Sequence, residues 1–286
     1  IPIIGWLGVL AIIGLIVFAT SNWRMALVSM ALVFSCGVLG MWTYAMDTLA
    51  LTMGAVFLSL AIAMPLGVWA GLNDRVMSFL RPILDLAQIT PTLVYLAPLA
   101  LVFLIGVAAS TIATMIYSIP IGIRITAYAI RNLQKGPLEA ADSMGSTRWQ
   151  KLRKVQLPMA KRTIILGVNQ TTLAALSFVV IAALIGAPGL GEPVIRALSI
   201  RNIGDGVTAG LAVVLLAIML DRSTTAAVVR SDQIPATGQA LLYRRVSLAV
   251  AGIVTVVAIM LSRQQLWAAV FPASLDFRDE IGGWVD

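Results

Sequence analysis

Long apolar runs alternate with short polar segments along nearly the whole chain. A helix that crosses the hydrocarbon core of a bilayer needs about 20 mostly apolar residues. Backbone groups in lipid must pair internally, and the runs lack the polar alternation of a membrane barrel, so each run is expected to be a helix. The pattern therefore predicts an all-α, polytopic membrane protein of about eight transmembrane helices. The runs are 3–20, 25–42, 46–71, 89–105, 107–130, 163–185, 207–220 and 246–262.

Basic residues gather on one side of the membrane if these spans alternate. The longest polar stretch, 131–162, lies between the fifth and sixth runs. If it faces the cytoplasm, only Arg196, Arg201, Arg263 and Arg278 lie outside, and the other basic residues lie inside. This asymmetry follows the positive-inside rule and puts both chain ends outside. The net charge of +7 is thus explained by topology, without a nucleic-acid partner.

Composition excludes several chemistries. Of the residues, 59% are hydrophobic and 12% are charged; histidine is absent, and Cys36 is the single cysteine. A zinc site, an intrachain disulfide and a histidine-dependent triad are therefore not expected. No GxxxxGK[ST] phosphate loop precedes any lysine, so the chain is not expected to bind ATP in that manner. The sequence predicts a protein that is not itself an enzyme.

The polar stretch begins with a pattern typical of a short helix. Pro137 suits the first helical position, because the N–H that it lacks would be unpaired there. Glu139 follows near the positive end of the helix dipole. Ala140, Ala141 and Met144 then give this helix a face of mostly small residues that a neighbour can approach closely.

A second short helix is predicted after a bend. Gly145 can adopt the left-handed conformation that closes the first helix. Ser146 or Thr147 can cap the second, with Gln150 placed to reach back. Pro158 is expected to end it. The stretch is thus read as two short helices joined at a glycine.

The same stretch carries a family signature. Its residues fit the pattern EAA, three residues, Gly, nine residues, Ile or Val, one residue, Leu-Pro, and it resembles the loop of binding-protein-dependent ABC importer permeases of type I. The resemblance implies a coupling helix that sits on a separate ATPase subunit, which binds ATP and magnesium. A basic amphipathic loop lying on anionic lipid is the alternative. The matching residues are Glu139, Ala140, Ala141, Gly145, Val155, Leu157 and Pro158.

Further segments narrow the resemblance. MWTYAMDTLALT from Met41, PLGVWAG from Pro65, ITPTLVYLAPLALVFLIG from Ile89 and GAPGLGEPVIRAL from Gly186 are similar to glycine betaine, proline and choline permeases. The implied substrate is a small osmoprotectant. No aromatic cluster suited to caging a quaternary ammonium is evident, so high-affinity selection is expected in an external binding protein.

Two parts of the chain are candidates for contact with the substrate or the binding protein. Prolines in the fourth run are expected to bend it and to expose backbone along a translocation path, although a simple kink would look the same. The candidate path residues are Thr90, Pro91, Tyr95 and Pro98. On the outer side, Gly186, Gly189 and Gly191 mark a candidate docking loop, or else an ordinary outer loop.

Few ionisable groups interrupt the spans. Asp47 and Arg124 lie near span ends, as interfacial or snorkelling residues do. A proton- or sodium-coupled carrier usually needs more such groups, so a secondary transporter or channel is the second hypothesis. A membrane scaffold without transport activity is the third.

The expected organisation has three parts: two spans in 1–45, a permease core in 46–222 with its coupling loop at 136–158, and a connector, eighth span and outer tail in 223–286. Cytoplasmic ATPase subunits and an external or fused binding protein are the expected partners. A second permease copy or domain, most simply a homodimer, would complete the pathway. The tail from Phe271 resembles the stretch that precedes the core spans in this permease group, although it could also be a plain interfacial tail. The expected location is the cell (inner) membrane of a bacterium or archaeon.

Overall fold

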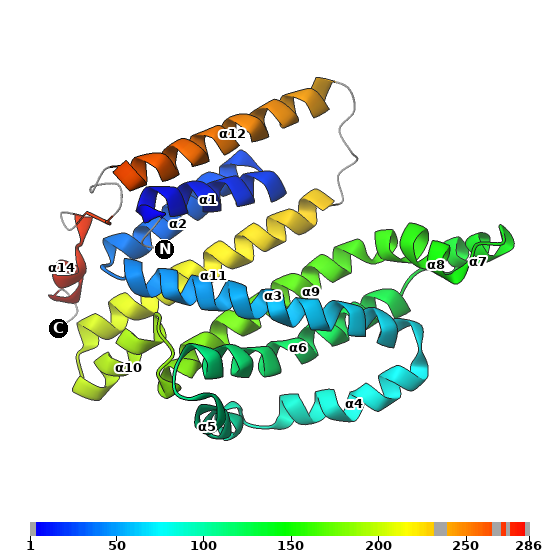
Figure 1. The fold of residues 1–286 in the computed structure, drawn as a ribbon, viewed down its shortest axis with the longest axis horizontal. Coiled ribbons are helices and arrows are strands. Elements are labelled where there is room, and N and C mark those ends of the chain that lie inside the picture. Colours follow the sequence, from blue (N-terminus) through cyan, green and yellow to red (C-terminus); the bar gives the residue numbers. More distant parts are fainter. Residues whose placement is uncertain (1–3, 232–238, 265–269, 273–274, 284–286) are drawn as a thin grey trace. The chain divides into compact units, whose positions relative to one another are not determined.

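The computed structural model describes residues 4–231, 239–264, 270–272 and 275–283, and these residues form helices and no strand. The all-α prediction is confirmed. The chain divides into two compact units, residues 1–51 with 179–286 (unit 1) and residues 52–178 (unit 2). The main helices are α1 (Gly5–Thr20), α2 (Trp23–Val38), α3 (Trp42–Leu72), α4 (Asp74–Ile89), α5 (Thr92–Phe103), α6 (Val107–Arg131), α7 (Lys135–Ser143), α8 (Arg148–Lys151), α9 (Leu157–Ala182), α10 (Gly191–Ile200), α11 (Ile203–Ser231), α12 (Gln239–Gln264) and α14 (Arg278–Gly283) (Figure 1).

Fewer helices than predicted are long enough to cross a bilayer. In the described residues, five helices meet the length and composition of a span, or six if the bent pair α4 and α5 is one span. Helices α1 and α2 are apolar but have 16 residues each. At 1.5 Å per residue each is about 24 Å long, short of a hydrocarbon core of about 30 Å. Length and composition thus support five or six of the eight predicted spans.

The predicted bend of the fourth span, 89–105, is confirmed at Pro91, and the span is therefore not a single helix. Helix α4 ends at Ile89, Thr90 is extended (φ −63°, ψ 124°), and α5 starts after Pro91 at an angle of 94° to α4. A residue before proline is pushed out of the helical region, which accounts for the break. Pro98, in contrast, lies inside α5, which continues to Phe103. Arg75 and Arg81, which the sequence places on the cytoplasmic side with most other basic residues, lie in α4.

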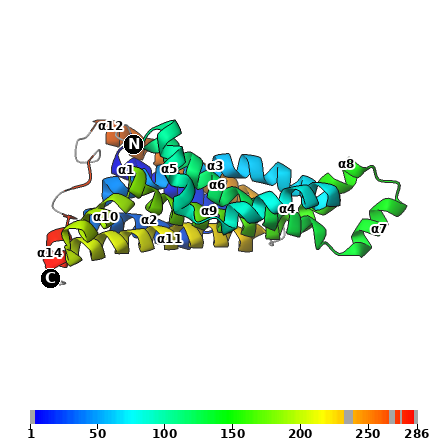
Figure 2. The same cartoon turned by 90° about the horizontal axis from the view of Figure 1, so that it is seen from below.

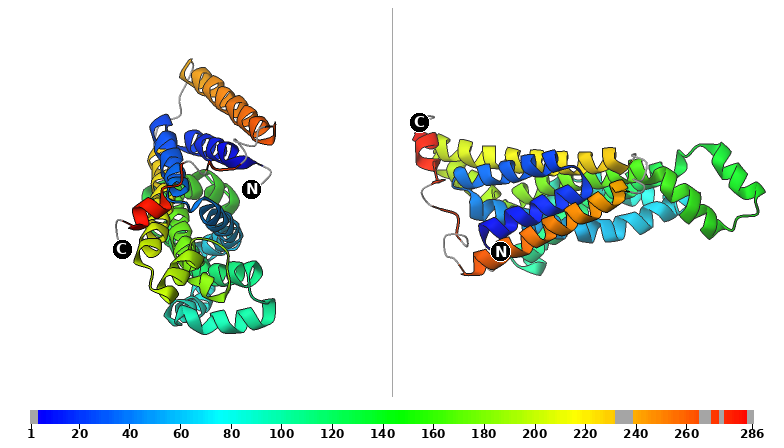
Figure 3. Two further views of the ribbon diagram at one scale, coloured as in Figure 1. Left: turned by 90° about the vertical axis from the view of Figure 1, so that its left-hand side faces the viewer. Right: turned by 90° about the horizontal axis from the view of Figure 1, so that it is seen from above.

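Unit 1 is built around α11. Helix α2 packs against both α1 and α11, and α12 packs against α1, as Figures 1 and 3 show. Near the end of α11, the Arg230 guanidinium donates to the carbonyls of Phe18 and Ala19 in the last turn of α1 and of Ser21 directly after it. This contact supplies partners for carbonyls that the end of α1 leaves unpaired.

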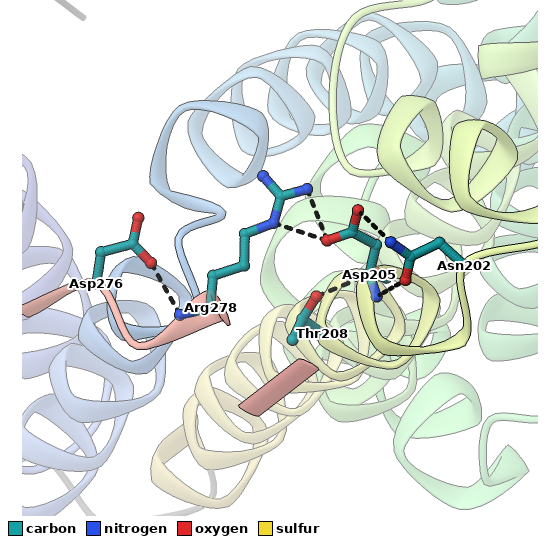
Figure 4. Close-up of polar contacts among 5 residues, drawn as sticks. All are labelled: Asn202, Asp205, Thr208, Asp276 and Arg278. Atoms are coloured by element: carbon teal, nitrogen blue, oxygen red, sulfur yellow. Dashed lines mark hydrogen bonds and ion pairs between the residues drawn. The ribbon is translucent and has the colours of Figure 1, made fainter. Parts of the chain in front are cut away.

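The C-terminal segment of unit 1 folds back onto the start of α11. Arg278 donates to Asp205 Oδ1 from Nε (2.9 Å) and from Nη2 (2.8 Å), as drawn in Figure 4. Asn202 caps α11, because its Oδ1 accepts from the Asp205 N–H at 2.9 Å. Gly204 lies so close to Gly282 that a Cβ would come within 2.6 Å of the Gly282 carbonyl oxygen. The described part of the predicted outer tail is therefore a packed element.

Aromatic side chains hold the preceding part of this segment in unit 1. The Phe271 ring stacks on Trp42 with centroids 5.3 Å apart, and it meets Trp6 edge-on at 5.5 Å and Phe34 at 5.6 Å. Such pairs add stability beyond the area that they bury. The predicted connector starts at residue 223, but α11 continues to Ser231 and α12 begins at Gln239; residues 232–238, between them, lie outside the described residues.

Unit 2 is packed through small residues on α3, α6 and α9. A Cβ at Gly67 would come within 2.6 Å of Thr126 Cβ, and one at Gly122 within 2.8 Å of Ala63 Cβ. Ser59 and Ser118 share a buried hydrogen bond of 2.8 Å between α3 and α6. Lipid tails are as apolar as core side chains, so close backbone approach and interhelical hydrogen bonds drive helix association in a membrane.

Candidate functional site

The predicted coupling loop forms a protruding elbow at one end of unit 2. The elbow comprises α7, the turn 144–147, α8 and the π-helical turn Leu152–Gln156, which leads directly into α9. Figure 2 shows it extending beyond the ends of α4 and α6. Helix α7 begins at Lys135, so Pro137 is its third residue and Glu139 lies past the first turn. The predicted start was two residues late, because the first four N–H groups of a helix need no intrahelical acceptor and Pro137 is tolerated at any of them.

The predicted glycine bend and cap are confirmed. Gly145 has φ +71°, in the left-handed region, and follows α7. Thr147 caps α8: its hydroxyl accepts from the Gln150 N–H at 3.3 Å, and the Gln150 side chain accepts from the Thr147 N–H at 2.9 Å. This capping box satisfies two helix-end donors at once. The path of the chain through the bend is therefore set by local interactions.

The prediction that Pro158 ends the second helix is wrong. The helix runs without interruption from Arg148 to Ile185. Proline lacks the N–H of a helical hydrogen bond, and its ring crowds the carbonyl four residues earlier. Here that residue is Lys154, which lies in the π-helical turn directly before α9. The wider turn accommodates the proline. The second arm of the elbow, which begins at Arg148, therefore continues into α9 as one helical rod.

The motif residues divide into two groups by burial. Ala141 is buried and Val155 is half-buried. Leu157 packs against a core of Ala129, Ile130 and Ala160 and thereby joins the start of α9 to the end of α6. The outward group is solvent-exposed and consists of Glu139, Ala140, Gly145 and Pro158. One group fixes the elbow to unit 2, and the other is free for contact.

The elbow also presents apolar side chains and a groove. Met144 is 85% exposed and Trp149 is 66% exposed. A cavity of about 500 Å³ lies between α7 and the second helix, with Ala140, Ala141 and Val155 in its lining. Lys151 Nζ and Asp142 Oδ2, 2.6 Å apart, link the two arms of the elbow. Apolar groups that protrude in this way are typical of a protein contact surface.

The candidate path residues lie at the break between α4 and α5. The Thr90 hydroxyl donates to the Leu86 carbonyl at 2.7 Å, and Pro91 occupies the cap position of α5. The Tyr95 ring stacks on Phe178 with centroids 5.9 Å apart, and Phe178 stacks on Tyr117 at 5.2 Å. Phe178 thus joins the two tyrosines in one aromatic cluster.

The candidate docking loop in unit 1 uses its glycines for close packing. Gly189 has φ +128°, and a Cβ there would overlap Thr48 Oγ1, which accepts from the Leu190 N–H at 2.7 Å. A Cβ at Gly191 would overlap the Val180 carbonyl oxygen. Both glycines are buried, whereas Gly186 is exposed in a left-handed helix cap. Of the three, Gly186 alone is accessible to a partner.

One ion pair in unit 2 was missed from the sequence. Arg124 on α6 pairs with Asp85 on α4, so Arg124 has a specific partner and is not a snorkelling residue. The two residues are 39 positions apart, and no local pattern in the sequence relates them. No group of three or more potential metal-binding side chains is found in the described ranges of the chain.

A bundle of apolar helices with a protruding, glycine-bent elbow and a proline-broken span defines a polytopic membrane permease. The family described as "Binding-protein-dependent transport system inner membrane component" matches residues 63–233, more than half of the chain. The chain belongs to this family. It is therefore a multi-pass inner-membrane permease subunit and not an enzyme.

Relatives and a solved structure agree with this assignment. The glycine betaine transport system permease protein OpuAB of Bacillus subtilis is 42% identical over 73% of this chain and 76% of its own length. The glycine betaine/proline betaine permease protein ProW of Escherichia coli is 40% identical over 77% of this chain and 64% of its own length. An inward-facing MetNI methionine ABC transporter chain matches 67% of this chain and 95% of its own with a TM-score of 0.62, at 21% identity.

Proposed function

We propose that this chain forms the membrane pathway of an ABC importer for a small osmoprotectant such as glycine betaine, proline or choline. The names of OpuAB and ProW support this substrate class. ATP and magnesium would bind in separate cytoplasmic ATPase subunits. The observation that carries the proposal is the elbow, which extends beyond the ends of α4 and α6 (Figure 2) and carries the exposed side chains of Met144 and Trp149.

The elbow is suited to transmit motion from an ATPase. Leu157 anchors it to the end of α6, and the helix from Arg148 to Ile185 is continuous, so displacement of the elbow would move α9 as a rod. Closure of two ATPase subunits on ATP would shift the bundle from inward-open to outward-open, and hydrolysis would reset it. The residues proposed to couple the two subunits are Glu139, Ala140, Ala141, Gly145, Val155, Leu157 and Pro158.

A second copy of the chain would complete the pathway. Helix α5 exposes Leu93 and Val94 next to the break at Pro91, and Leu101 near its other end. Irregular backbone at membrane depth must border protein or water and not lipid. A second copy packed near this break, related by a two-fold axis, would cover it and enclose a path that includes Thr90, Pro91, Tyr95 and Pro98. On the outer side, Gly186 and the neighbouring loop would face the binding protein.

Copurification of the ATPase tests the proposal. Replacing both Met144 and Trp149 with glutamate should lower the amount of ATPase that copurifies by about tenfold, because both side chains would lie in the desolvated contact. Lys135→Glu, an exposed change on the same elbow, is the control for added negative charge and should retain the ATPase. Full retention by the double variant would contradict the assignment of the elbow.

Uptake by vesicles separates this proposal from a secondary transporter. Vesicles that contain the complete assembly should accumulate glycine betaine only when ATP is supplied on the side of the membrane where the elbow lies. Accumulation driven by a proton or sodium gradient without ATP would favour the secondary transporter.

A further inference from the structure

A charged cavity of about 410 Å³ lies between α4 and α6 in unit 2. Its lining includes Arg81 and Asp85 from α4, and Arg124, Tyr128 and Arg131 from α6. Three cations and one carboxylate therefore face the same space. The volume is within the range of about 300 to 1,000 Å³ that is usual for small-molecule sites.

The hydrogen-bonding capacity of this cavity is incompletely used. Arg124 pairs with Asp85, but the Arg124 Nε is buried and has no hydrogen-bond partner among the described residues. Arg131 binds the Ala70 carbonyl (2.8 Å from Nη2) and the Asp74 carboxylate (2.7 Å from Nη1). Arg81 is exposed and makes no ion pair with the described part of the chain. A guanidinium N–H without a partner is a strong donor to a carboxylate.

The depth of the cavity determines what it can face. Arg124 lies seven residues before the end of α6 at Arg131, about 10 Å along the helix axis. Charged groups at such depth face a protein interior or a water-filled space, not lipid tails. The side chains of Arg124 and Asp85 are 37% and 44% exposed, respectively. This face of α4 and α6 is thus best explained as the wall of an aqueous vestibule.

The arrangement of charges fits a zwitterion better than a simple anion. Guanidinium groups bind a carboxylate through paired N–H donors. Asp85 and the Tyr128 ring, whose residue is 62% exposed, would attract an ammonium group at the other end of the same molecule. A phospholipid phosphate would gain from the arginines but would be repelled by Asp85.

We infer that this cavity is an inner station of the pathway that binds the carboxylate end of a zwitterionic substrate through Arg81 and Arg124. The inference rests on the proposed transport function and narrows its substrate class. Glycine betaine and proline carry the required carboxylate, whereas choline does not. Selection by this station would therefore distinguish carboxylated substrates from choline even when the external binding protein is absent.

Binding of glycine betaine and of choline to the purified permease and ATPase assembly, without the binding protein, tests the inference. Binding would be measured by saturation-transfer NMR in detergent micelles. Loss of one charge-assisted contact in Arg81→Gln should weaken glycine betaine binding by about tenfold and leave choline binding unchanged. Arg124→Gln should act in the same direction.

Two controls separate binding from folding. Arg75→Gln removes an exposed arginine from the same helix outside the cavity, and it should bind glycine betaine as the original protein does. The double exchange Asp85→Arg with Arg124→Asp should retain the ion pair and assembly, yet lose glycine betaine binding. Full recovery of binding in the exchanged protein would show a purely structural pair and overturn the inference.

Other outcomes would also overturn it. Unchanged glycine betaine binding in both Arg81→Gln and Arg124→Gln would do so, as would an equal loss for choline. Loss of copurifying phosphatidylglycerol alone, detected by native mass spectrometry, would identify a lipid headgroup site instead. If the unsubstituted assembly still imports glycine betaine with ATP, these results reject the station and leave the transport function intact.

Discussion

Gly145 in the elbow of unit 2 and Gly189 in the candidate docking loop of unit 1 have the same type of backbone and very different surroundings. Both lie at positive φ, +71° and +128°. A Cβ at Gly145 would meet nothing within 4 Å, whereas one at Gly189 would overlap Thr48 Oγ1. Gly145 is needed only because its backbone has positive φ. Gly189 is needed for the same reason and also because no Cβ fits beside Thr48.

Because of this difference, Gly145 determines the direction of the elbow, whereas Gly189 also determines how tightly its loop packs. The Gly145 turn is exposed, so a substitution there alters the direction of the elbow and leaves the core of unit 2 intact. The Gly189 turn is buried and carries the Leu190 hydrogen bond to Thr48, so a substitution disturbs the packing of α3 against the candidate docking loop. Substitutions at these two glycines should thus have different effects.

The largest effect on stability is expected for Gly189→Ala. The added Cβ displaces Thr48 and leaves the buried Leu190 N–H without its acceptor, which should cost about 3 kcal/mol in the free energy of unfolding. Thermal unfolding in detergent would detect this loss. Gly206→Ala is the control, because its Cβ would lie 3.6 Å from Ala197 Cβ, an ordinary contact. An equal change in both variants would show that Gly189 has no special packing role.

A smaller effect on stability and a large effect on coupling are expected for Gly145→Val. A β-branched residue at positive φ costs about 1 to 2 kcal/mol, enough to redirect an exposed turn but not to unfold the bundle. Uptake driven by ATP should fall about tenfold, while membrane insertion stays unchanged and the unfolding temperature falls by only a few degrees. Gly145→Asn, which tolerates the left-handed region, should retain uptake. Normal coupled uptake in the valine variant would contradict this role.

The smallest effect is expected for Thr147→Ala. The substitution removes the hydroxyl acceptor of the capping box and should cost about 1 kcal/mol of local helix stability. The bend at Gly145 remains, so we expect uptake to fall by about threefold and limited proteolysis within the elbow to become faster. Thr147→Ser keeps the acceptor and should behave as the original protein does. A loss as large as that of the valine variant would show that the cap, not the glycine, directs the elbow.

Local features of the elbow could be predicted from the sequence. Gly145 closes a helix and Thr147 caps the next one because both effects depend on residues within four positions. The all-α architecture likewise follows from the length of the apolar runs. Such features need no knowledge of distant contacts.

Features that depend on distant residues could not be predicted. The partner of Arg124 is Asp85, which lies on another helix and 39 positions earlier in the chain. Nothing in a single sequence places Thr48 against Gly189, although the two are in direct contact. Pro158 was misjudged because the π-helical turn that accommodates it has no simple residue signature.

That π-helical turn has a geometric consequence for the elbow. A π turn adds a residue to an α-helix, and each residue rotates the chain by about 100° around the axis. The azimuth at which Met144 and Trp149 project is therefore set by the number of residues in 152–156. Deleting one of them would restore the ordinary helical phase and rotate Met144 and Trp149 about the helix axis. Insertions and deletions here should therefore be far less tolerated than substitutions.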